Sequence, residues 1–322
     1  MSEPSERGGL ILLLLLLLAG LAARLGGLDE GFWIDEVISA DTAAMPTLEL
    51  LTRSGLADVH PPGYYLTLKV WTALAGTSDL AARALTLLIS LATVAGVAVY
   101  ARARYGSISA QGAALVLALW PFHVHYGVEV RSYALLAGLT LAALASMERL
   151  LERSTCPRRL TVTVVAMGAL VWTHTLGLLV AAILLVAGTL KARGPALEVL
   201  RAVSWMSAAL FAPWLPMLLV QLRHQPEAMT AHLAADLPLS QLLAALGPAP
   251  FTSLAPAAGL GALVLGVAWV ALWRVPPRQG TEVEGEVAEG VSLRPWHVAA
   301  TVLALLGPLL PLMAVAGAAT RV

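Results

Sequence analysis

The stretch GLILLLLLLLAGLAARLGGLDEGFWIDEVISAD, residues 9–41, places a long apolar run before two adjacent carboxylates, Asp35 and Glu36. The chain of 322 residues is 58% hydrophobic and 12% charged, whereas soluble domains carry about 25% charged residues. A helix needs about 20 apolar residues to cross a bilayer, and several further runs approach that length. The sequence therefore predicts an all-α polytopic membrane protein.

The apolar runs divide into about nine predicted spans within a single transmembrane domain, 1–322. The fifth and sixth meet in WTHTLG, Trp172–Gly177. We interpret the first run, which follows Arg7, as a retained anchor; a cleaved signal peptide is the alternative, because small residues lie near Ala19–Ala23. The predicted spans are 9–28, 80–100, 108–127, 132–148, 160–176, 177–190, 199–221, 254–273 and 296–316.

Charged residues sort between the alternate loops, as the positive-inside rule requires. This distribution predicts a multi-pass protein of the cytoplasmic (plasma) membrane with its N-terminus inside. The long first loop, 29–79, is then extracytoplasmic, and within it Thr47–Leu56 has the spacing of an amphipathic interfacial helix. Segment 274–295, rich in glutamate, glycine and proline, reads as a disordered cytoplasmic linker. The predicted inner side carries Arg7, Arg102, Arg104, Arg149, Arg153, Arg158, Arg159, Lys191, Arg193, Arg201, Arg274, Arg278 and Arg294.

Net charge and cysteine content argue against a nucleic-acid partner and against cysteine-based cross-links or metal sites. The formal net charge is zero and no basic block stands out, so no nucleic-acid partner is expected. Cys156 is the single cysteine, which excludes an intramolecular disulfide and a cysteine-based metal cluster.

Polar residues gather in the segments predicted to face outward, in DVHPPGYY (58–65), HVHYGVEVRSYAL (123–135) and WTHTLG. Charges at a membrane edge are costly to desolvate, so they mark function or are paired. Each feature also has a structural reading. The acid pair would be a solvated flank, and HPPGYY a stiff turn. Glu129 and Arg131 would form a local ion pair, and His174 would be a hydrogen-bonded interior histidine.

The order of the motifs WIDEVISADTA, LLTRSGLADVHPPGYYLTLKVW and WPFHVHYGVEVRSYALL resembles bacterial members of glycosyltransferase family 39. These are relatives of the dolichyl-phosphate-mannose–protein mannosyltransferases and of the lipid A aminoarabinose transferase. The resemblance runs from about Trp33 to Glu148 and continues through THTLG and PWLPMLLVQL (213–222). It implies the membrane fold called GT-C and a sugar donor carried on polyprenyl phosphate, used on the outer face of the membrane.

Two departures from the family pattern bear on these expectations. Many relatives read Tyr-Ser-Gln-Glu-Ala-Arg where this chain has YGVEVRSY, so that the Glu and Arg are kept and the polar neighbours are not. Family members are also usually longer, which suggests a C-terminal truncation or a short variant ending at Val322.

The resemblance also implies roles for individual residues. Asp35 matches the first acid of the family pair and is the candidate general base that activates an acceptor hydroxyl. Glu36 is an alternate base, an orienting group or an ion-pair partner. Arg131 is the candidate ligand of the donor phosphate, since guanidinium groups bind phosphate well. The expected donor-binding set is Asp58, His60, Tyr64, Tyr65, Glu129, Arg131, Tyr133 and His174.

The sequence assigns no cofactor to this scheme. A divalent cation held by the two acids, with Asp58, His60 or His174 as further ligands, stays open, and the metal is unknown.

The predicted function is inverting transfer of a hexosyl or pentosyl group from a polyprenyl-phosphate donor at the outer face of the membrane. The acceptor would be a hydroxyl of a protein, a glycolipid or a cell-wall glycan. A transporter or flippase for a polyprenyl-linked glycan is one alternative, although transport favours polar residues near the midplane. The other is a non-catalytic, shortened relative acting as a membrane partner.

Overall fold

A computed structural model describes residues 6–56, 60–154, 156–192 and 194–218. Within these ranges the regular structure is helical and contains no strand, which confirms the predicted all-α class. The helices are α1 (Glu6–Ala22), α2 (Ile34–Ala44), α3 (Thr47–Leu56), α4 (Gly63–Ala75), α5 (Asp79–Tyr105), α6 (Ser107–Leu119), α7 (Pro121–His125), α8 (Tyr133–Glu152), α9 (Pro157–Thr173), α10 (Thr175–Lys191) and α11 (Pro195–Phe211). Short 3₁₀ turns cover Leu25–Gly27 and Ala212–Trp214.

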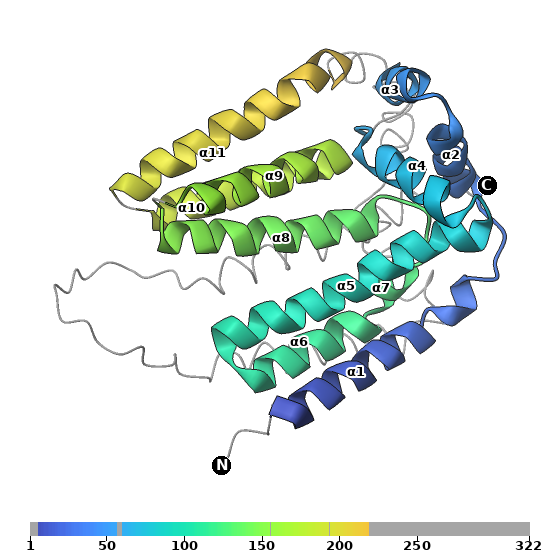
Figure 1. Cartoon of the computed structure of the whole chain (residues 1–322), viewed down its shortest axis with the longest axis horizontal. Coiled ribbons are helices and arrows are strands. Elements are labelled where there is room, and N and C mark those ends of the chain that lie inside the picture. Colours follow the sequence, from blue (N-terminus) through green and yellow to red (C-terminus); the bar gives the residue numbers. More distant parts are fainter. Residues whose placement is uncertain (1–5, 57–59, 155, 193, 219–322) are drawn as a thin grey trace, which may run out of the picture.

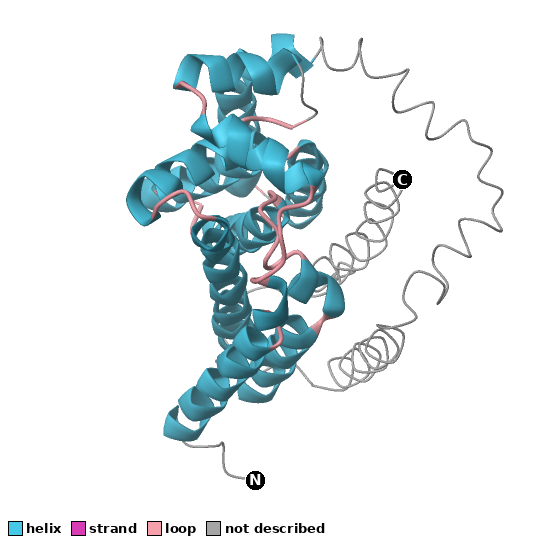
Figure 2. Cartoon of the chain, turned by 90° about the vertical axis from the view of Figure 1, so that its right-hand side faces the viewer, coloured by secondary structure: helices cyan, strands magenta, loops and turns pink. Residues whose placement is uncertain are grey.

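The long helices form an elongated bundle in which successive helices run in opposite directions (Figure 1). Helix α5 packs against α6, α8 and α1, and α9 packs against α8, α10 and α11. The short helices α2, α3 and α4 gather at one end of this bundle, where α1 and α9 end and α5 and α8 begin. Figure 2 views the molecule from that end and shows helices and loops throughout the described residues.

Three of the described helices are long and apolar enough to cross a membrane: Gly8–Gly27, Asp79–Tyr105 and Tyr133–Glu152. Shorter apolar helices cover Ser107–Leu119 and Thr175–Leu190. Each of the first six predicted spans overlaps a helix or a helix pair, and the described part of the seventh, 199–218, overlaps α11 and the turn that follows it. The predicted spans 254–273 and 296–316 and the linker 274–295 lie outside the described residues.

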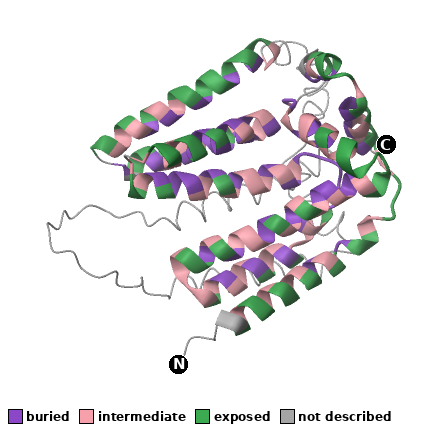
Figure 3. Ribbon diagram, viewed as in Figure 1, coloured by how far each residue is buried: buried purple, intermediate pink, exposed green. Residues whose placement is uncertain are grey.

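Burial follows the faces that the helices turn toward one another, as Figure 3 shows for α8 and α9. Helix α1 is covered with exposed leucines; Leu10, for example, is 58% exposed and Leu18 is 59% exposed. Large apolar side chains in such number on an outer surface are expected of a helix that faces lipid. Burial therefore agrees with a membrane protein.

Two predicted spans are interrupted in the structure. The span 108–127 is divided at Trp120, because Pro121 begins the short helix α7 and cannot continue the hydrogen bonding of α6. Helices α9 and α10 separate at His174, whose φ of −157° and ψ of 146° are extended. A Cβ on Gly177 would lie 2.2 Å from the Leu170 carbonyl oxygen, so a glycine is needed at this tight turn.

The segment predicted to be amphipathic forms α3 with the predicted bounds, Thr47–Leu56. Leu50 on its inner face is fully buried, while Leu48 is 78% exposed. Its amphipathic character is confirmed, and it packs beside α2 at the end of the bundle that carries the polar motifs.

Candidate active site

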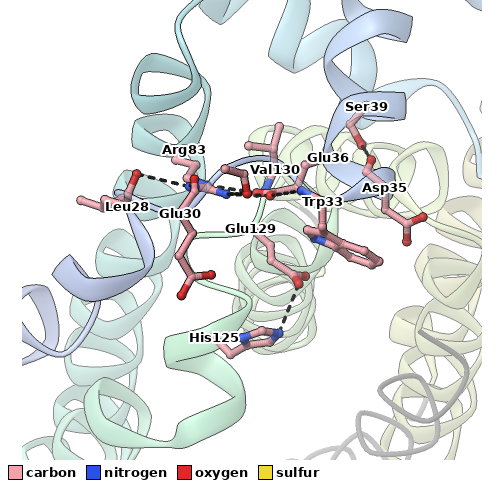
Figure 4. A network of polar contacts seen from close by, with 11 residues as sticks. Leu28, Glu30, Trp33, Asp35, Glu36, Ser39, Arg83, His125, Glu129 and Val130 are labelled. Atoms are coloured by element: carbon pink, nitrogen blue, oxygen red, sulfur yellow. Dashed lines mark hydrogen bonds and ion pairs between the residues drawn. The ribbon is translucent and has the colours of Figure 1, made fainter. Parts of the chain in front are cut away.

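The carboxylate of Glu36 lies at the centre of a buried polar network (Figure 4). Arg83, in the first turns of α5, donates from Nε to Glu36 Oε1 at 3.1 Å and from Nη2 to Oε2 at 2.7 Å. The backbone N–H of Val130 donates to Oε1 at 2.9 Å, and that of Trp33 donates to Oε2 at 3.3 Å. Both oxygens of Glu36 are therefore engaged, which favours the ion-pair role among the three that the sequence left open.

Arg83 also holds the linker between α1 and α2. Its Nη1 donates to the carbonyl oxygens of Leu28, at 3.2 Å, and of Glu30, and its Nη2 donates to Gly31 O at 3.2 Å. The guanidinium carbon lies 5.3 Å from the ring centroid of Phe32, within the range of a cation–π contact. One arginine thus fixes the chain that leads into α2. Sequence reasoning missed it, although a charge inside a predicted span was an available signal.

Asp35 points away from this network toward the partly exposed side of α2 (Figure 4). Its side chain is 27% exposed, and its Oδ2 lies 3.8 Å from Arg131 Nη2. Arg131 also donates from Nη1 to Ser39 Oγ at 3.5 Å, one turn further along α2. The structure therefore brings together the proposed base and the proposed phosphate ligand, from segments almost one hundred residues apart.

The segment Tyr126–Tyr133 carries the Glu-x-Arg motif, formed by Glu129 and Arg131. The predicted local pair of Glu129 with Arg131 is not the contact that forms; Glu129 instead lies 3.2 Å from His125 Nε2 through its Oε1. Glu129 is 7% exposed in its side chain, whereas His125 is 53% exposed. Among the described residues, Glu129 Oε2 is buried with no hydrogen-bond partner.

A row of aromatic side chains connects three of the predicted site motifs. The ring centroids of His60 and His174 are 4.2 Å apart, and His174 lies 5.6 Å from Tyr133. Tyr133 contacts Tyr126 edge-on, at 4.6 Å between centroids. Burial, aided by the positive charge of Arg131, lowers the pKa of His60 to about 3. His60 is therefore neutral at physiological pH.

His174 fits the structural reading made from the sequence. It is 3% exposed, and its Nδ1 accepts a hydrogen bond from Leu176 N at 3.0 Å, which caps α10. This capping fixes the orientation of the ring that faces His60.

Tyr64 and Tyr65 lie on α4 and are both buried. Tyr64 OH is 3.4 Å from Thr86 Oγ1, and burial raises the pKa of the Tyr64 phenol. The preceding Gly63 contacts α9 so closely that an added Cβ would lie 2.5 Å from the Trp172 carbonyl oxygen. The HPPGYY motif thus sets how closely α4 approaches α9.

A second buried arginine, Arg24, supports the loop that follows α6. It donates from Nε to Ser90 Oγ at 3.0 Å and from Nη1 to the carbonyl oxygens of Gly20, at 2.6 Å, and Ala118, at 2.9 Å. Its Nη2 lies 2.8 Å from His123 Nδ1 and donates to His123 O at 3.1 Å. Through these contacts Arg24 connects α1, α5, α6 and α7.

Most of the predicted site residues therefore share one end of the bundle. Asp35 approaches Arg131, and His60, His174 and Tyr133 form the aromatic row, while Glu36 belongs to the buried network. Asp58 lies outside the described residues. Within the part of the chain that the structure describes, no group of three or more His, Cys, Asp or Glu side chains is arranged to hold a metal ion.

Comparison with known proteins finds similarity to one sequence family and to one solved structure. The sequence model described as "Dolichyl-phosphate-mannose-protein mannosyltransferase" matches residues 59–217. Among solved structures, the chain is similar to ArnT from Cupriavidus metallidurans in the apo state, with a TM-score of 0.51 and 18% sequence identity. That match covers 93% of this chain and 58% of ArnT, so the chain spans little more than half of the solved relative. Comparison with curated protein sequences gives no match.

The two comparisons agree with the motif order that the sequence displays. The family match contains HPPGYY, the Glu-x-Arg segment and THTLG. The ArnT match extends the similarity of fold to the helices before residue 59. The resemblance predicted from the sequence is therefore confirmed: residues 59–217 of this membrane protein are similar to the dolichyl-phosphate-mannose–protein mannosyltransferases, and the fold is similar to that of ArnT.

Proposed function

We propose that the chain transfers a sugar from a polyprenyl-phosphate carrier to an acceptor hydroxyl, with inversion at the anomeric carbon. The observation that carries this proposal is the 3.8 Å approach of the Asp35 carboxylate to the Arg131 guanidinium in a partly exposed setting. A carboxylate accepts the proton of the attacking hydroxyl, and a guanidinium stabilises charge on the departing phosphate. The reaction needs both groups at one place.

In this scheme, Asp35 takes the acceptor proton while the acceptor oxygen attacks the anomeric carbon. The bond from that carbon to the phosphate oxygen breaks, and the carrier leaves as a phosphate anion beside Arg131. The partial exposure of Asp35 admits an aqueous acceptor. His60, Tyr64, Tyr65, Glu129, Tyr133, His174 and Asp58 are proposed to surround the donor phosphate and sugar.

The orientation in the membrane is proposed from the two ends of the bundle. The end opposite Asp35 carries Arg102 and Arg104 on α5, Arg149 on α8, and Arg158 on α9. Basic residues remain on the cytoplasmic side, so this end is assigned inside and Asp35 outside. A plasma-membrane protein with its N-terminus inside, about nine spans and an extracytoplasmic loop 29–79 satisfies this assignment.

The sugar class, hexosyl or pentosyl, and the acceptor, whether protein, glycolipid or cell-wall glycan, are to be determined by assay. Membranes containing the chain would be supplied with a panel of radiolabelled polyprenyl-phosphate sugars, and release of the label from the carrier would be followed. The variants compared are Asp35→Asn and Asp41→Asn, since Asp41 is an exposed acid on the same helix.

We expect the parent chain and Asp41→Asn to consume one donor, and Asp35→Asn to turn over at least about 100-fold more slowly. Parent-like turnover by Asp35→Asn would reject this residue as the base. If inserted, folded parent protein consumes no donor from the panel, the proposed transfer is rejected.

A further inference from the structure

A hydrogen bond of the Glu36 carboxylate connects the two halves of the proposed active site. Glu36 Oε1 accepts from the backbone N–H of Val130 at 2.9 Å. Asp35 directly precedes Glu36, and Arg131 directly follows Val130. Any movement of the Glu36 carboxylate relative to Val130 would therefore change the distance between Asp35 and Arg131.

The position of that carboxylate is set by Arg83. The guanidinium donates to both Glu36 oxygens, at 3.1 and 2.7 Å, and is 3% exposed. Its remaining hydrogen bonds go to the carbonyl oxygens of Leu28, Glu30 and Gly31, which precede α2. The planar fork of an arginine restricts the carboxylate in both direction and distance.

Arg83 is itself held on a rigid support. It lies in α5, the longest described helix, whose first turn is capped by the hydroxyl of Ser78, which accepts from Ala81 N at 3.2 Å. Helix α5 packs against α6, α8, α1 and α4. The helix bundle, and not the loop alone, therefore fixes the position of Arg83 and of the Glu36 carboxylate that it binds.

From these contacts we propose that Arg83 is a positioning residue, which acts through the Glu36 carboxylate and the Val130 N–H to set the separation of Asp35 and Arg131. The inference rests on the proposed function in assigning a catalytic consequence to that separation. Arg83 itself does not touch the Asp35 carboxylate. It acts on the position of that carboxylate relative to the Arg131 guanidinium.

Arg83→Lys tests this role because lysine keeps the positive charge but lacks the planar, five-donor fork. The matched control is Arg104→Lys. Arg104 lies at the other end of α5 and also pairs with glutamates, Glu148 at 3.2 Å and Glu152 at 2.6 Å. Both variants would be purified in nanodiscs and assayed with the polyprenyl-phosphate sugar that the parent consumes.

For Arg83→Lys we expect kcat per folded molecule to fall about 10- to 100-fold, because small misplacements of reacting groups are costly. The donor KM should stay within about threefold of the parent value, since the phosphate ligand is retained. Arg104→Lys should keep both constants. Parent-like kcat in the folded Arg83→Lys protein would assign Arg83 to stability alone and overturn the inference.

A second measurement does not depend on turnover. Spin labels would be attached at Val37→Cys on α2 and Leu119→Cys at the end of α6, in a Cys156→Ser background; both positions are exposed. We expect a narrow distance distribution in the parent and in Arg104→Lys, and a broadened or displaced one in Arg83→Lys. An unchanged distribution in Arg83→Lys would overturn the inference. If the parent consumes no donor but Arg83→Lys still changes the spin-label distances, sugar transfer would be rejected. The role of Arg83 in positioning α2 would nevertheless be supported.

Discussion

Asp35 and Glu36 are neighbours in the sequence, yet their carboxylates belong to different environments. Glu36 is 1% exposed and is bonded to Arg83, Val130 N and Trp33 N, whereas Asp35 is 27% exposed and approaches Arg131 at 3.8 Å. Successive side chains of a helix project about 100° apart. A helix that begins at Ile34 therefore turns one acid inward and the other toward the open side (Figure 4).

Because the two carboxylates point in different directions, Glu36 can form a buried ion pair while Asp35 is available as the proposed base. The inner carboxylate is buried, and both of its oxygens accept hydrogen bonds from Arg83 and from backbone N–H groups, so it does not face a substrate. The outer carboxylate faces a guanidinium and partial solvent exposure, as the proposed base requires. Asp35 and Glu36 are therefore not expected to substitute for each other.

Substitution of Arg131 is expected to affect donor binding most strongly. Arg131→Lys keeps a charge but loses bidentate contact with phosphate, so we expect the donor KM to rise about tenfold, with a smaller change in kcat. Steady-state kinetics with varied donor would measure this. Arg53→Lys, at an exposed position on α3, is the matched control. An unchanged donor KM in Arg131→Lys would exclude Arg131 as a phosphate ligand.

Gly63→Ala is expected to destabilise the protein by about 1–3 kcal/mol. The new Cβ would meet the Trp172 carbonyl at 2.5 Å and force α4 away from α9. Thermal unfolding in detergent measures the change. Gly112→Ala, on α6, is the control, because a Cβ there meets nothing within 4 Å and alanine favours a helix. Equal melting temperatures for the two variants would contradict the close approach.

Acid sensitivity is expected from His60. Its pKa is lowered to about 3 in the folded protein, against 6.5 in the unfolded chain. Between these values the unfolded state binds more protons, so stability rises with pH from about 3 to about 6.5 and is lost as pH falls through that window. Melting temperatures at about pH 7.5 and about pH 5 should differ less in His60→Gln than in the parent. If the melting temperature changes equally with pH in His60→Gln and in the parent, His60 does not cause the acid sensitivity.

The end of the bundle opposite Asp35 should contribute stability without affecting catalysis. Glu148 is 8% exposed and accepts from Tyr100 OH at 2.8 Å, beside its ion pair with Arg104. We expect Glu148→Ala to cost about 2–4 kcal/mol, since removal of one partner strands the other. Glu198→Ala should cost less than about 1 kcal/mol, because its pair with Arg201 is largely exposed. Denaturation curves and donor turnover would test both statements; a loss of kcat in folded Glu148→Ala would contradict them.

The sequence predicted the elements well where hydrophobic runs and breakers agree. The break at WTHTLG and the helix Thr47–Leu56 occur where the residues indicated. The interruption at Trp120 was not predicted, although Pro121 marks it. A hydropathy pattern averages over such a proline, so span boundaries are clearer from it than kinks within a span.

For the site, motif order predicted which residues gather at one end, but not how they pair. Arg24 and Arg83 were included in predicted spans and assigned no role, while in the structure they organise the polar networks. Glu129 pairs with His125 rather than with Arg131. Which side chains form ion pairs depends on how each helix is rotated and on which helices pack together. The spacing of residues along one segment does not determine either.

The Glu36 network also imposes an order on biogenesis. Arg83 is synthesised 47 residues after Glu36, and Val130 comes 94 residues after it. At translation rates of about 5–20 residues per second, Glu36 would wait about 5–20 s for its last partner. During that interval the first loop has already left the ribosome while the segment bearing Arg131 has yet to be inserted. Completion of the site therefore coincides with the arrival of α8 in the membrane, so a nascent chain interrupted before that point would leave the Glu36 carboxylate without its full set of hydrogen-bond donors.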